Sequence, residues 1–230
     1  MIEKYYNGVI EQVAGGIGNV EHNSILVRYS NDFSIWDLES VNHYKDQTDI
    51  FFTCHEFSYN KIAEAYEPYL GLIRQMFHKY CSGTLEEFME ECDVYKLQRP
   101  VFESYFEKGF CERTEQILID EVEYEQERMR NSIVTMLQKL SEIRPVVIVL
   151  NRFQLASKST MQLTNRLLQT KNKNIGIVLG VNDVQSIPEF AHEEWDAICE
   201  SMDDRNMVYH IGNAGRNMEP DVMDYYSCLL

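Results

Sequence analysis

The sequence predicts an α/β fold in which helices cover a parallel sheet as a three-layer sandwich. The apolar run Val146–Leu150 is typical of a strand buried on both faces, as the strands of parallel sheets are. Strand-like and helix-like segments alternate along the chain, which favours parallel pairing through helical connections. A long helical stretch between Thr84 and Leu140 interrupts this alternation. We therefore expect a single domain with a helical insertion over about residues 84–140.

The expected strands are short, apolar and bounded by polar residues: Ser24–Ser30, Asp49–Cys54, Val146–Leu150, Asn174–Gly180 and Met207–Ile211. The expected helices follow from apolar spacing, capping residues and helix breakers. They are Ile2–Val13, a segment from Asp32 or Ser34 to about Tyr44, Ala63–Cys81, Thr84–Leu140 with breaks near Pro100 and Gly109, Ser157–Leu168, Trp195–Met202 and Asp221–Leu230.

Length and composition agree with one compact domain over residues 1–230. The chain of 230 residues is 44% hydrophobic and 25% charged, which is ordinary globular usage. It contains no apolar run near the roughly 20 residues that a bilayer crossing needs, and Met1–Tyr6 has no signal-peptide pattern. We expect a cytoplasmic protein without membrane contact. Because the sequence ends at Leu230 without a terminal signal, a fragment of a longer protein is a further expectation.

The charge is strongly acidic, with a formal net value of −16. Between Glu86 and Glu127 there are fourteen acidic and four basic residues. Such a surface repels phosphate backbones, so direct binding of nucleic acid is excluded from the expected functions. Two interpretations of the acidic stretch remain open: a solvated helix face, or a docking site for a basic protein partner.

No pattern of catalytic or metal-binding residues is found. The six cysteines form no CxxC pair, and the groupings His78-x-x-Cys81 and Cys54-His55-Glu56 have no second pair at zinc-like spacing. No Gly-x-Ser-x-Gly elbow or cysteine-centred signature accompanies the histidines. We therefore predict no metal site and no catalytic residue.

Two segments in the second half of the chain carry a resemblance to a known family. The run Pro145–Ser157 and, after a helix, the run Asn174–Asp183 resemble the second half of an AAA-type ATPase domain. The closest kind is the signal-transduction ATPases with numerous domains (STAND proteins). Tyr66–Arg74 resembles the helix after the second strand in that family, and the likeness covers most of residues 24–211. It implies a P-loop NTPase-like sandwich in which the strand ending at Leu150 lies next to the first strand.

The chain departs from that family where the chemistry of hydrolysis resides. The family has two acids after the strand, whereas this sequence has Asn151 and Arg152, and Arg152 would repel magnesium. The following loop, Phe153–Ala156, still matches. The strand Ile175–Gly180 resembles the sensor strand of the family, whose polar tip normally contacts the γ-phosphate.

The phosphate loop is also degenerate. If the first strand is Ile25–Tyr29, the loop position is Ser30–Trp36, which has no glycine and no lysine. A second alignment uses Gly15–Asn19, with Gly8–Ala14 as the first strand and Asn19 in place of the lysine. A third interpretation makes the glycine cluster a simple loop. The nucleotide-binding positions that the resemblance implies, all degenerate, are Asn31, Asp32, Ser34, Asn151, Arg152, Asn182 and Asp183.

Three functional hypotheses follow. The first is a catalytically inactive NTPase-like regulatory or scaffolding module of a signalling protein, with no cofactor and with a protein partner or downstream effector domain. The second is a sensor that binds ATP and Mg²⁺ without efficient hydrolysis, using Arg28, Arg152 or Arg216 in place of the lysine. The third is an unrelated acidic interaction domain.

A group of aromatic residues in and before the insertion has two interpretations. One interpretation is an exposed patch that marks a protein interface, and the other is that these side chains pack the inserted helices. The residues in question are Tyr59, Tyr66, Tyr69, Phe102, Tyr105, Phe106 and Phe110.

Overall fold

The computed structural model describes residues 2–18, 23–29, 49–58, 64–109, 122–182, 187–203 and 208–211. The chain divides into two compact units. We call residues 1–65 together with 145–230 the sheet unit, and residues 66–144 the helical unit. The expected insertion over about 84–140 lies within the helical unit. The helices expected near Asp32–Tyr44 and over Asp221–Leu230 lie outside the described residues.

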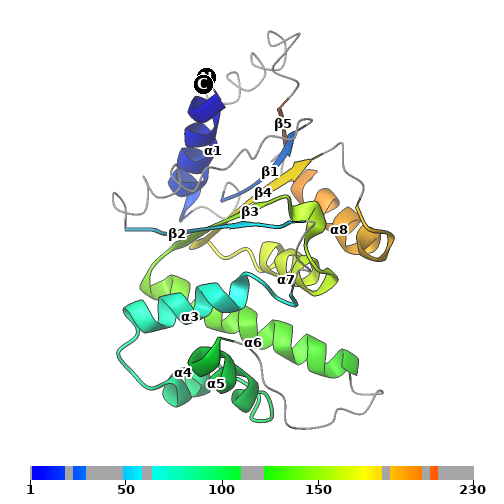
Figure 1. The fold of residues 1–230 in the computed structure, drawn as a ribbon. Coiled ribbons are helices and arrows are strands. Elements are labelled where there is room, and N and C mark those ends of the chain that lie inside the picture. Colours follow the sequence, from blue (N-terminus) through cyan, green and yellow to red (C-terminus); the bar gives the residue numbers. More distant parts are fainter. Residues whose placement is uncertain are drawn as a thin grey trace. The chain divides into compact units, whose positions relative to one another are not determined.

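The sheet unit contains a parallel sheet of five strands, which confirms the predicted fold class (Figure 1). Its strands are β1 (Ser24–Tyr29), β2 (Phe51–Glu56), β3 (Val146–Asn151), β4 (Ile175–Asn182) and β5 (Val208–Ile211). The order is β2-β3-β4-β1-β5, and all neighbours pair in parallel. Every residue of β3 and β4 is buried, which explains why their sequences are apolar without alternation.

The expected position of β3 beside β1 is wrong, because β4 lies between them. β4 pairs with β1 through Leu26↔Leu179 and with β3 through Ile148↔Ile177. A strand in the middle of a sheet is buried on both faces and paired along both edges. β4 is buried at all eight positions, and it pairs with β1 over residues 177–182 and with β3 over residues 175–179. The chain passes from β1 to the far edge at β2, returns through β3 to β4, and then crosses β1 to β5. The connections therefore leave the β1–β4 pair in opposite directions.

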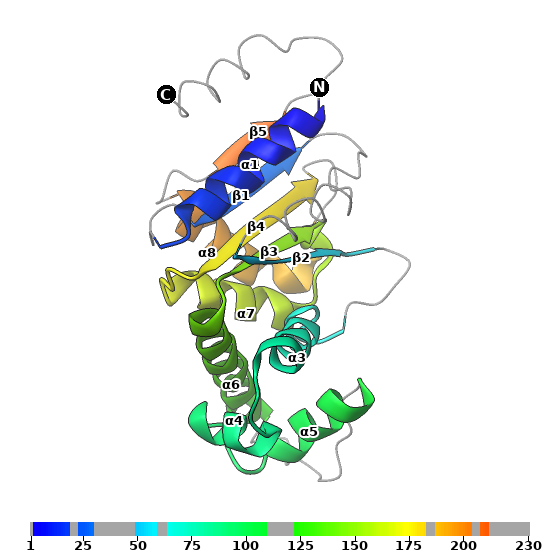
Figure 2. The same ribbon diagram turned by 90° about the vertical axis from the view of Figure 1, so that its left-hand side faces the viewer.

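Helices cover both faces of the sheet. On one face, α1 (Ile2–Gly16) buries Val13 against a cluster that includes Val27 and Val149. On the other, α8 (His192–Asp203) contacts β1 through the next residue, Arg28, because successive side chains of a strand point to opposite faces. α7 (Lys158–Gln169) packs beside α8. Figure 2 shows α1 in front of the sheet and α7 and α8 behind it.

The helix α1 decides between the two phosphate-loop alignments. The alignment that makes Gly8–Ala14 a strand is wrong, since these residues are helical and the helix continues to Gly16. Val13 follows Val9 by four residues and Ile10 by three, and all three are buried, as expected for a helix that packs on one side. Gly18, with φ of 95°, then turns the chain, and its N–H donates to the Lys173 carbonyl at 2.7 Å. The remaining alignment, Ser30–Trp36, lies outside the described residues.

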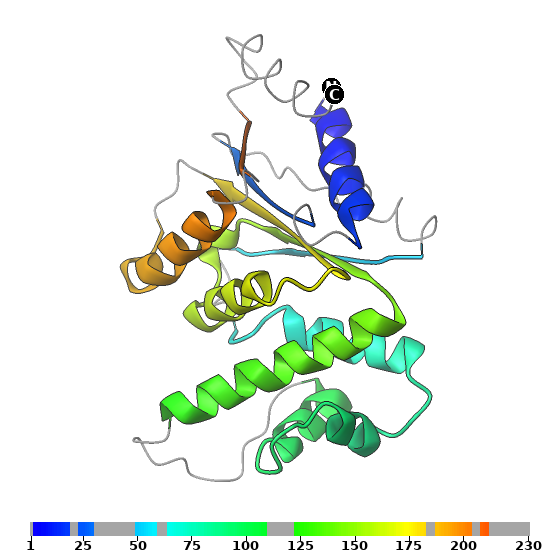
Figure 3. The same cartoon turned by 180° about the vertical axis from the view of Figure 1, so that it is seen from behind.

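The helical unit contains α3 (Tyr69–Tyr80), α4 (Leu85–Glu91), α5 (Arg99–Lys108) and α6 (Val122–Ile143), and Figure 3 shows α6 as a long helix above α4 and α5. α3 begins at Tyr69 and not near Ala63, because the residue before Pro68 is disfavoured in a helix. Thr84 and Glu87 form a capping box at the start of α4, and Gly109, with φ of 82°, ends α5.

Three of the aromatic residues that were expected either to form an exposed patch or to pack the inserted helices are buried, so the exposed-patch interpretation is wrong for them. Tyr69, Phe102 and Phe106 are at most 3% exposed and form the core of the helical unit. Phe77 joins them, with its ring 5.4 Å from that of Phe106. Tyr59 and Phe110 lie outside the described residues. None of the helices in the described ranges combines the length and apolarity that a bilayer crossing requires.

Candidate functional site

The carboxyl end of the sheet is where the sequence places its candidate site. Ligands of open α/β sheets bind outside the carboxyl ends of the strands, at the point where the connections leave in opposite directions. Here that point is the β1–β4 pair, with β3 on the other side of β4. Asn151 ends β3 and Asn182 ends β4, so the two residues lie at the same edge on neighbouring strands.

Asn151 is turned into the protein. Its side chain is fully buried, and its Oδ1 accepts a hydrogen bond from the Arg152 N–H at 2.9 Å. Its backbone carbonyl accepts the Phe57 N–H at 3.0 Å. An acid at this position would offer anionic oxygens to a metal ion, whereas the amide carries no charge and its oxygen is engaged with the backbone. Asn151 therefore satisfies backbone N–H groups at the end of β3.

Arg152 forms an ion pair with Glu56, the last residue of β2. The Nε–Oε1 distance is 3.3 Å, and the strand register places Glu56 opposite Asn151. Both side chains are partly exposed, so the pair contributes about 1 kcal/mol or less. Arg152 has φ of 51°, a left-handed conformation that is uncommon outside glycine. Arg152 therefore places a guanidinium at the end of β3, where it is paired with the Glu56 carboxylate.

Gln154 connects the ends of β3 and β4. It lies in one turn of 3₁₀ helix after Arg152, is fully buried, and its Oε1 accepts the Asn182 N–H at 3.3 Å. Asn182 itself is 3% exposed. Buried amides are stable only when they are hydrogen-bonded, and each such bond fixes the local backbone. Gln154 thus ties the end of β4 to the loop after β3.

Aromatic side chains fill the space behind this edge. Phe153 is fully buried, and its ring lies 6.2 Å from Phe57 and 6.4 Å from Trp195 of α8. Arg28 stacks on Trp195, with its guanidinium carbon 5.7 Å from the ring centroid, and donates to Cys199 Sγ at 3.2 Å. Arg28 therefore lies on the α8 face of β1. Arg216, another candidate replacement for the loop lysine, lies outside the described residues.

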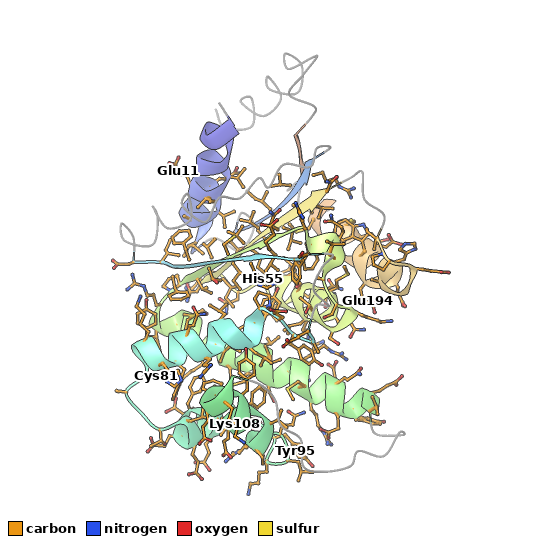
Figure 4. All side chains as sticks on the ribbon, viewed as in Figure 1. Glu11, His55, Cys81, Tyr95, Lys108 and Glu194 are labelled. Atoms are coloured by element: carbon orange, nitrogen blue, oxygen red, sulfur yellow. The ribbon has the colours of Figure 1, made fainter. Side chains whose placement is uncertain are left out.

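Glu194 is an acidic residue in the first turn of α8, and Figure 4 labels it. Its Oε1 accepts hydrogen bonds from Gln162 at 2.8 Å and forms an ion pair with Lys158 at 3.2 Å. Burial raises the pKa of the Glu194 carboxyl, but the hydrogen bonds from Gln162 and Lys158 outweigh it, so the net pKa lies below the usual value. These contacts join α7 to α8 and give the carboxylate a structural role.

Metal and nucleophile chemistry find little support in the described ranges. They contain no group of three or more His, Cys, Asp or Glu side chains arranged to hold a metal ion. Burial raises the pKa of Cys92 to about 12, and burial also raises the pKa of Cys81. Both thiols are therefore protonated and weakly nucleophilic at neutral pH.

Of the seven positions that the resemblance implied, the structure brings Asn151, Arg152 and Asn182 to one edge. The remaining positions lie outside the described residues and are Asn31, Asp32, Ser34 and Asp183. The sequence analysis missed the roles of Gln154 and Glu56. Gln154 stands in the matched loop after β3, which was a usable signal. Glu56 attracted notice only as a neighbour of Cys54 and His55, because the pairing of β2 with β3 is not visible in the sequence.

No protein-family model matches this chain, and no curated protein is similar to it in sequence.

Proposed function

We propose that the chain is a catalytically inactive, NTPase-like regulatory or scaffolding module of a signalling protein, and that it acts by binding a protein partner or a downstream effector domain. The proposal rests on the sequence resemblance to P-loop ATPases of the STAND type together with the chemistry at the end of β3. The strand order does not support the resemblance, because β4 lies between β3 and β1 where the resemblance implied direct neighbours. It includes a cytoplasmic location, no membrane or nucleic-acid contact and no bound cofactor.

One observation carries the proposal: the end of β3 holds a buried amide and an arginine where magnesium-dependent hydrolysis needs carboxylates. Asn151 is fully buried with its Oδ1 on the backbone, and Arg152 is engaged with Glu56 at 3.3 Å. Hydrolysis of a nucleoside triphosphate depends on a metal held by carboxylate or hydroxyl oxygens and on a positioned water. Neither residue at the expected metal position supplies an anionic oxygen: Asn151 is neutral, and Arg152 is a cation that repels the metal.

The test is a thermal-shift titration with ATP, ADP and GTP at millimolar concentration, with and without Mg²⁺, accompanied by a phosphate-release assay. A ligand present at 100 times its dissociation constant stabilises the folded state by about 2.7 kcal/mol, which moves the melting temperature by several degrees. We expect no shift and no phosphate release.

A Mg²⁺-dependent shift would contradict the inactive module and favour the alternative, an ATP sensor without efficient hydrolysis. The variant Arg152→Ala serves as the control for that outcome. If Arg152 replaces the missing lysine, Arg152→Ala abolishes the shift. If the shift survives, the nucleotide binds through residues outside this edge.

A further inference from the structure

The guanidinium of Arg152 contacts the protein at one of its three nitrogens. Its Nε lies 3.3 Å from Glu56 Oε1. Within the described part of the chain, its two terminal nitrogens, Nη1 and Nη2, donate no hydrogen bond to a protein atom. These two nitrogens carry four of the five N–H donors of a guanidinium and form the edge that faces away from the side-chain stem. Four donors of Arg152 are therefore available to a ligand or to solvent.

Other partly buried arginines bond through their terminal nitrogens. Arg74 Nη2 donates to the Glu107 carbonyl at 3.4 Å, and Arg130 Nη2 donates to Glu127 Oε2 at 2.9 Å. The side chains of Arg130 and Arg152 are 16% and 26% exposed, so both are largely withdrawn from water. A withdrawn guanidinium has lost part of its hydration and favours an anionic hydrogen-bond partner. Arg130 has that partner within the chain, whereas the terminal nitrogens of Arg152 are placed to take one from outside it.

The backbone holds Arg152 in an uncommon conformation at an edge of the ligand-binding type. Its φ of 51° and ψ of 43° lie in the left-handed region, which residues other than glycine seldom adopt. Such conformations cluster at ligand-binding sites, where the surrounding structure imposes them. Here Asn151 Oδ1 accepts the Arg152 N–H at 2.9 Å, and the next residue, Phe153, is fully buried. The turn is therefore fixed on both sides, which lowers the entropic cost of binding through Arg152.

The charge at the end of β3 favours an anion with a single negative charge. Arg152 and Glu56 together have a formal charge of zero, and the whole chain carries −16. An anion at Nη1 and Nη2 is attracted by the guanidinium and repelled by the Glu56 carboxylate, and this repulsion doubles for a dianion such as sulfate. A carboxylate also has two oxygens in one plane, so that it accepts one hydrogen bond from each terminal nitrogen.

We infer that the end of β3 is a binding site for a carboxylate, which Arg152 holds through Nη1 and Nη2 while Glu56 stays beside Nε. The carboxylate belongs to a free organic acid or to a polypeptide partner, and both present the same group to the same two nitrogens. In this site Glu56 positions the guanidinium and also limits the affinity through its charge. The inference deepens the proposed function and rests on it, because it takes this edge to hold neither metal nor nucleotide.

The experiment is an NMR titration of the full chain with sodium acetate, with sodium chloride at equal ionic strength as the reference. The Nε–H signal of Arg152, assigned by its loss in Arg152→Lys, moves with acetate and not with chloride. A ligand as small as acetate covers little surface, so we expect a dissociation constant on the order of 10 mM.

Glu56→Gln is the decisive variant, because it removes the competing negative charge and keeps the shape of the side chain. It strengthens acetate binding about threefold to tenfold. Glu127→Gln is the matched control: it removes the same charge from an arginine–glutamate pair of the helical unit and leaves acetate binding at Arg152 unchanged. Arg152→Lys keeps the positive charge but loses the two-nitrogen fork, and it weakens binding about tenfold, followed in that variant by the backbone N–H signal of Phe153.

Three results would overturn the inference. The Arg152 signal responds to acetate no more than to chloride, Glu56→Gln binds acetate no more tightly than the unsubstituted chain, or sulfate binds more tightly than acetate. A tripeptide with a free carboxyl terminus and the same tripeptide as its amide distinguish the two sources of the carboxylate. If the free tripeptide binds more tightly than acetate and the amide does not bind, the source is a polypeptide partner. If the free tripeptide and acetate bind equally, the source is a free organic acid.

The nucleotide titration is a separate measurement. A Mg²⁺-dependent shift with ATP would remove the inactive-module proposal without deciding whether acetate binds. The absence of an acetate response would remove the carboxylate site and leave the inactive module as it is.

Discussion

Buried amide side chains lie at both ends of the sheet, but the groups around them differ. At the amino end, Asn23 is 3% exposed, and its Nδ2 donates to the carbonyls of Asn172 at 2.7 Å and Ile175 at 2.8 Å. At the carboxyl end, Asn151 and Gln154 are equally buried but lie beside charged groups. The amino-end amide donates to two backbone carbonyls and accepts the Ser24 hydroxyl at 3.4 Å, whereas the carboxyl-end amides occupy the edge at which α/β sheets bind ligands.

The amides at the carboxyl end satisfy backbone groups and leave little of their own polarity free for a ligand. At the carboxyl end, Asn151 and Gln154 each accept a backbone N–H, whereas Asn23 at the amino end donates to backbone carbonyls. In both cases a buried amide satisfies polar groups of the backbone. Arg152 and Glu56 neutralise each other beside them. If the comparison is correct, substitutions at the two ends change the stability of the fold and neither end responds to nucleotide.

The substitution Asn151→Asp tests the carboxyl end most severely. It introduces a carboxyl group into a fully buried position, where desolvation raises the pKa. Each unit of that shift lowers the free energy of unfolding by about 1.4 kcal/mol at a pH where the carboxylate is charged. We expect a loss of about 3 kcal/mol in the free energy of unfolding at pH 7, measured by urea denaturation. The loss is small below the unfolded pKa of about 3.9, where the carboxyl is protonated in both states, and it grows as the pH rises to the folded pKa.

Asn165→Asp is the matched control for this substitution, because Asn165 is a half-buried amide on α7. It changes stability by about 0.5 kcal/mol or less. A gain of Mg²⁺-dependent stabilisation by ATP in Asn151→Asp would contradict the structural interpretation. It would mean that the edge is a nucleotide site that lacks one carboxylate.

The substitution Asn23→Ala tests the amino end. It removes a buried hydrogen bond to the Ile175 carbonyl and a partly buried one to the Asn172 carbonyl, and leaving buried polar groups without partners costs about 1–3 kcal/mol. We expect a loss of about 2 kcal/mol in urea denaturation with no dependence on pH, in contrast to Asn151→Asp. Asn165→Ala is the control. A pH-dependent loss in Asn23→Ala would show that a titrating group lies at the amino end, so the two ends would not differ in charge.

The sequence identified the strands and most helices of the sheet, because buried parallel strands are apolar at every position, as Val146–Asn151 and Ile175–Asn182 are. It failed on the strand order, since periodicity specifies which faces are buried but not which strand pairs with which. For the same reason neither Asn23, which bonds across to Asn172, nor the pairing of Glu56 with Arg152 was foreseen. These contacts depend on strand register between distant segments.

The substitution Gly176→Ala tests how tightly α1 closes the amino end. An added Cβ would lie 2.6 Å from Val13 Cγ1, 3.1 Å from the Asn23 carbonyl oxygen and 3.2 Å from Val147 Cγ2. Overpacking of this kind costs about 1–3 kcal/mol, and we expect about 1.5 kcal/mol from thermal or urea denaturation. The closest atom belongs to a side chain, so Val13→Ala provides a partner for a double-mutant cycle.

In that cycle, Gly176→Ala costs less in the Val13→Ala background than in the unsubstituted chain, because the methyl group at 2.6 Å is gone. Equal costs in both backgrounds would mean that the contact with the Asn23 carbonyl, and not with α1, limits the space at Gly176. The amino end would then be closed by the backbone and not by helix packing.

The smallest expected effect concerns Glu194, near the carboxyl end. Burial opposes ionisation of its carboxyl, but hydrogen bonds from Gln162 and Lys158 lower its pKa in the folded state. A lowered folded pKa stabilises the fold above the unfolded pKa of about 4.3, and this contribution is lost as the pH falls through the folded pKa. Lys158 is about half exposed, so solvent screening limits the contribution to about 1 kcal/mol or less.

The substitution Glu194→Gln therefore lowers stability at pH 7 and makes little difference in acid, whereas Asn151→Asp behaves in the same direction but with a larger loss. The control Glu193→Gln, at an exposed neighbouring position, changes neither. Urea denaturation between pH 3 and pH 7 measures both variants. If Glu194→Gln is neutral at pH 7, the α7–α8 contact does not depend on charge. The ion pair with Lys158 would then contribute nothing to stability, and the carboxyl end would be stabilised by buried amide hydrogen bonds, as the amino end is.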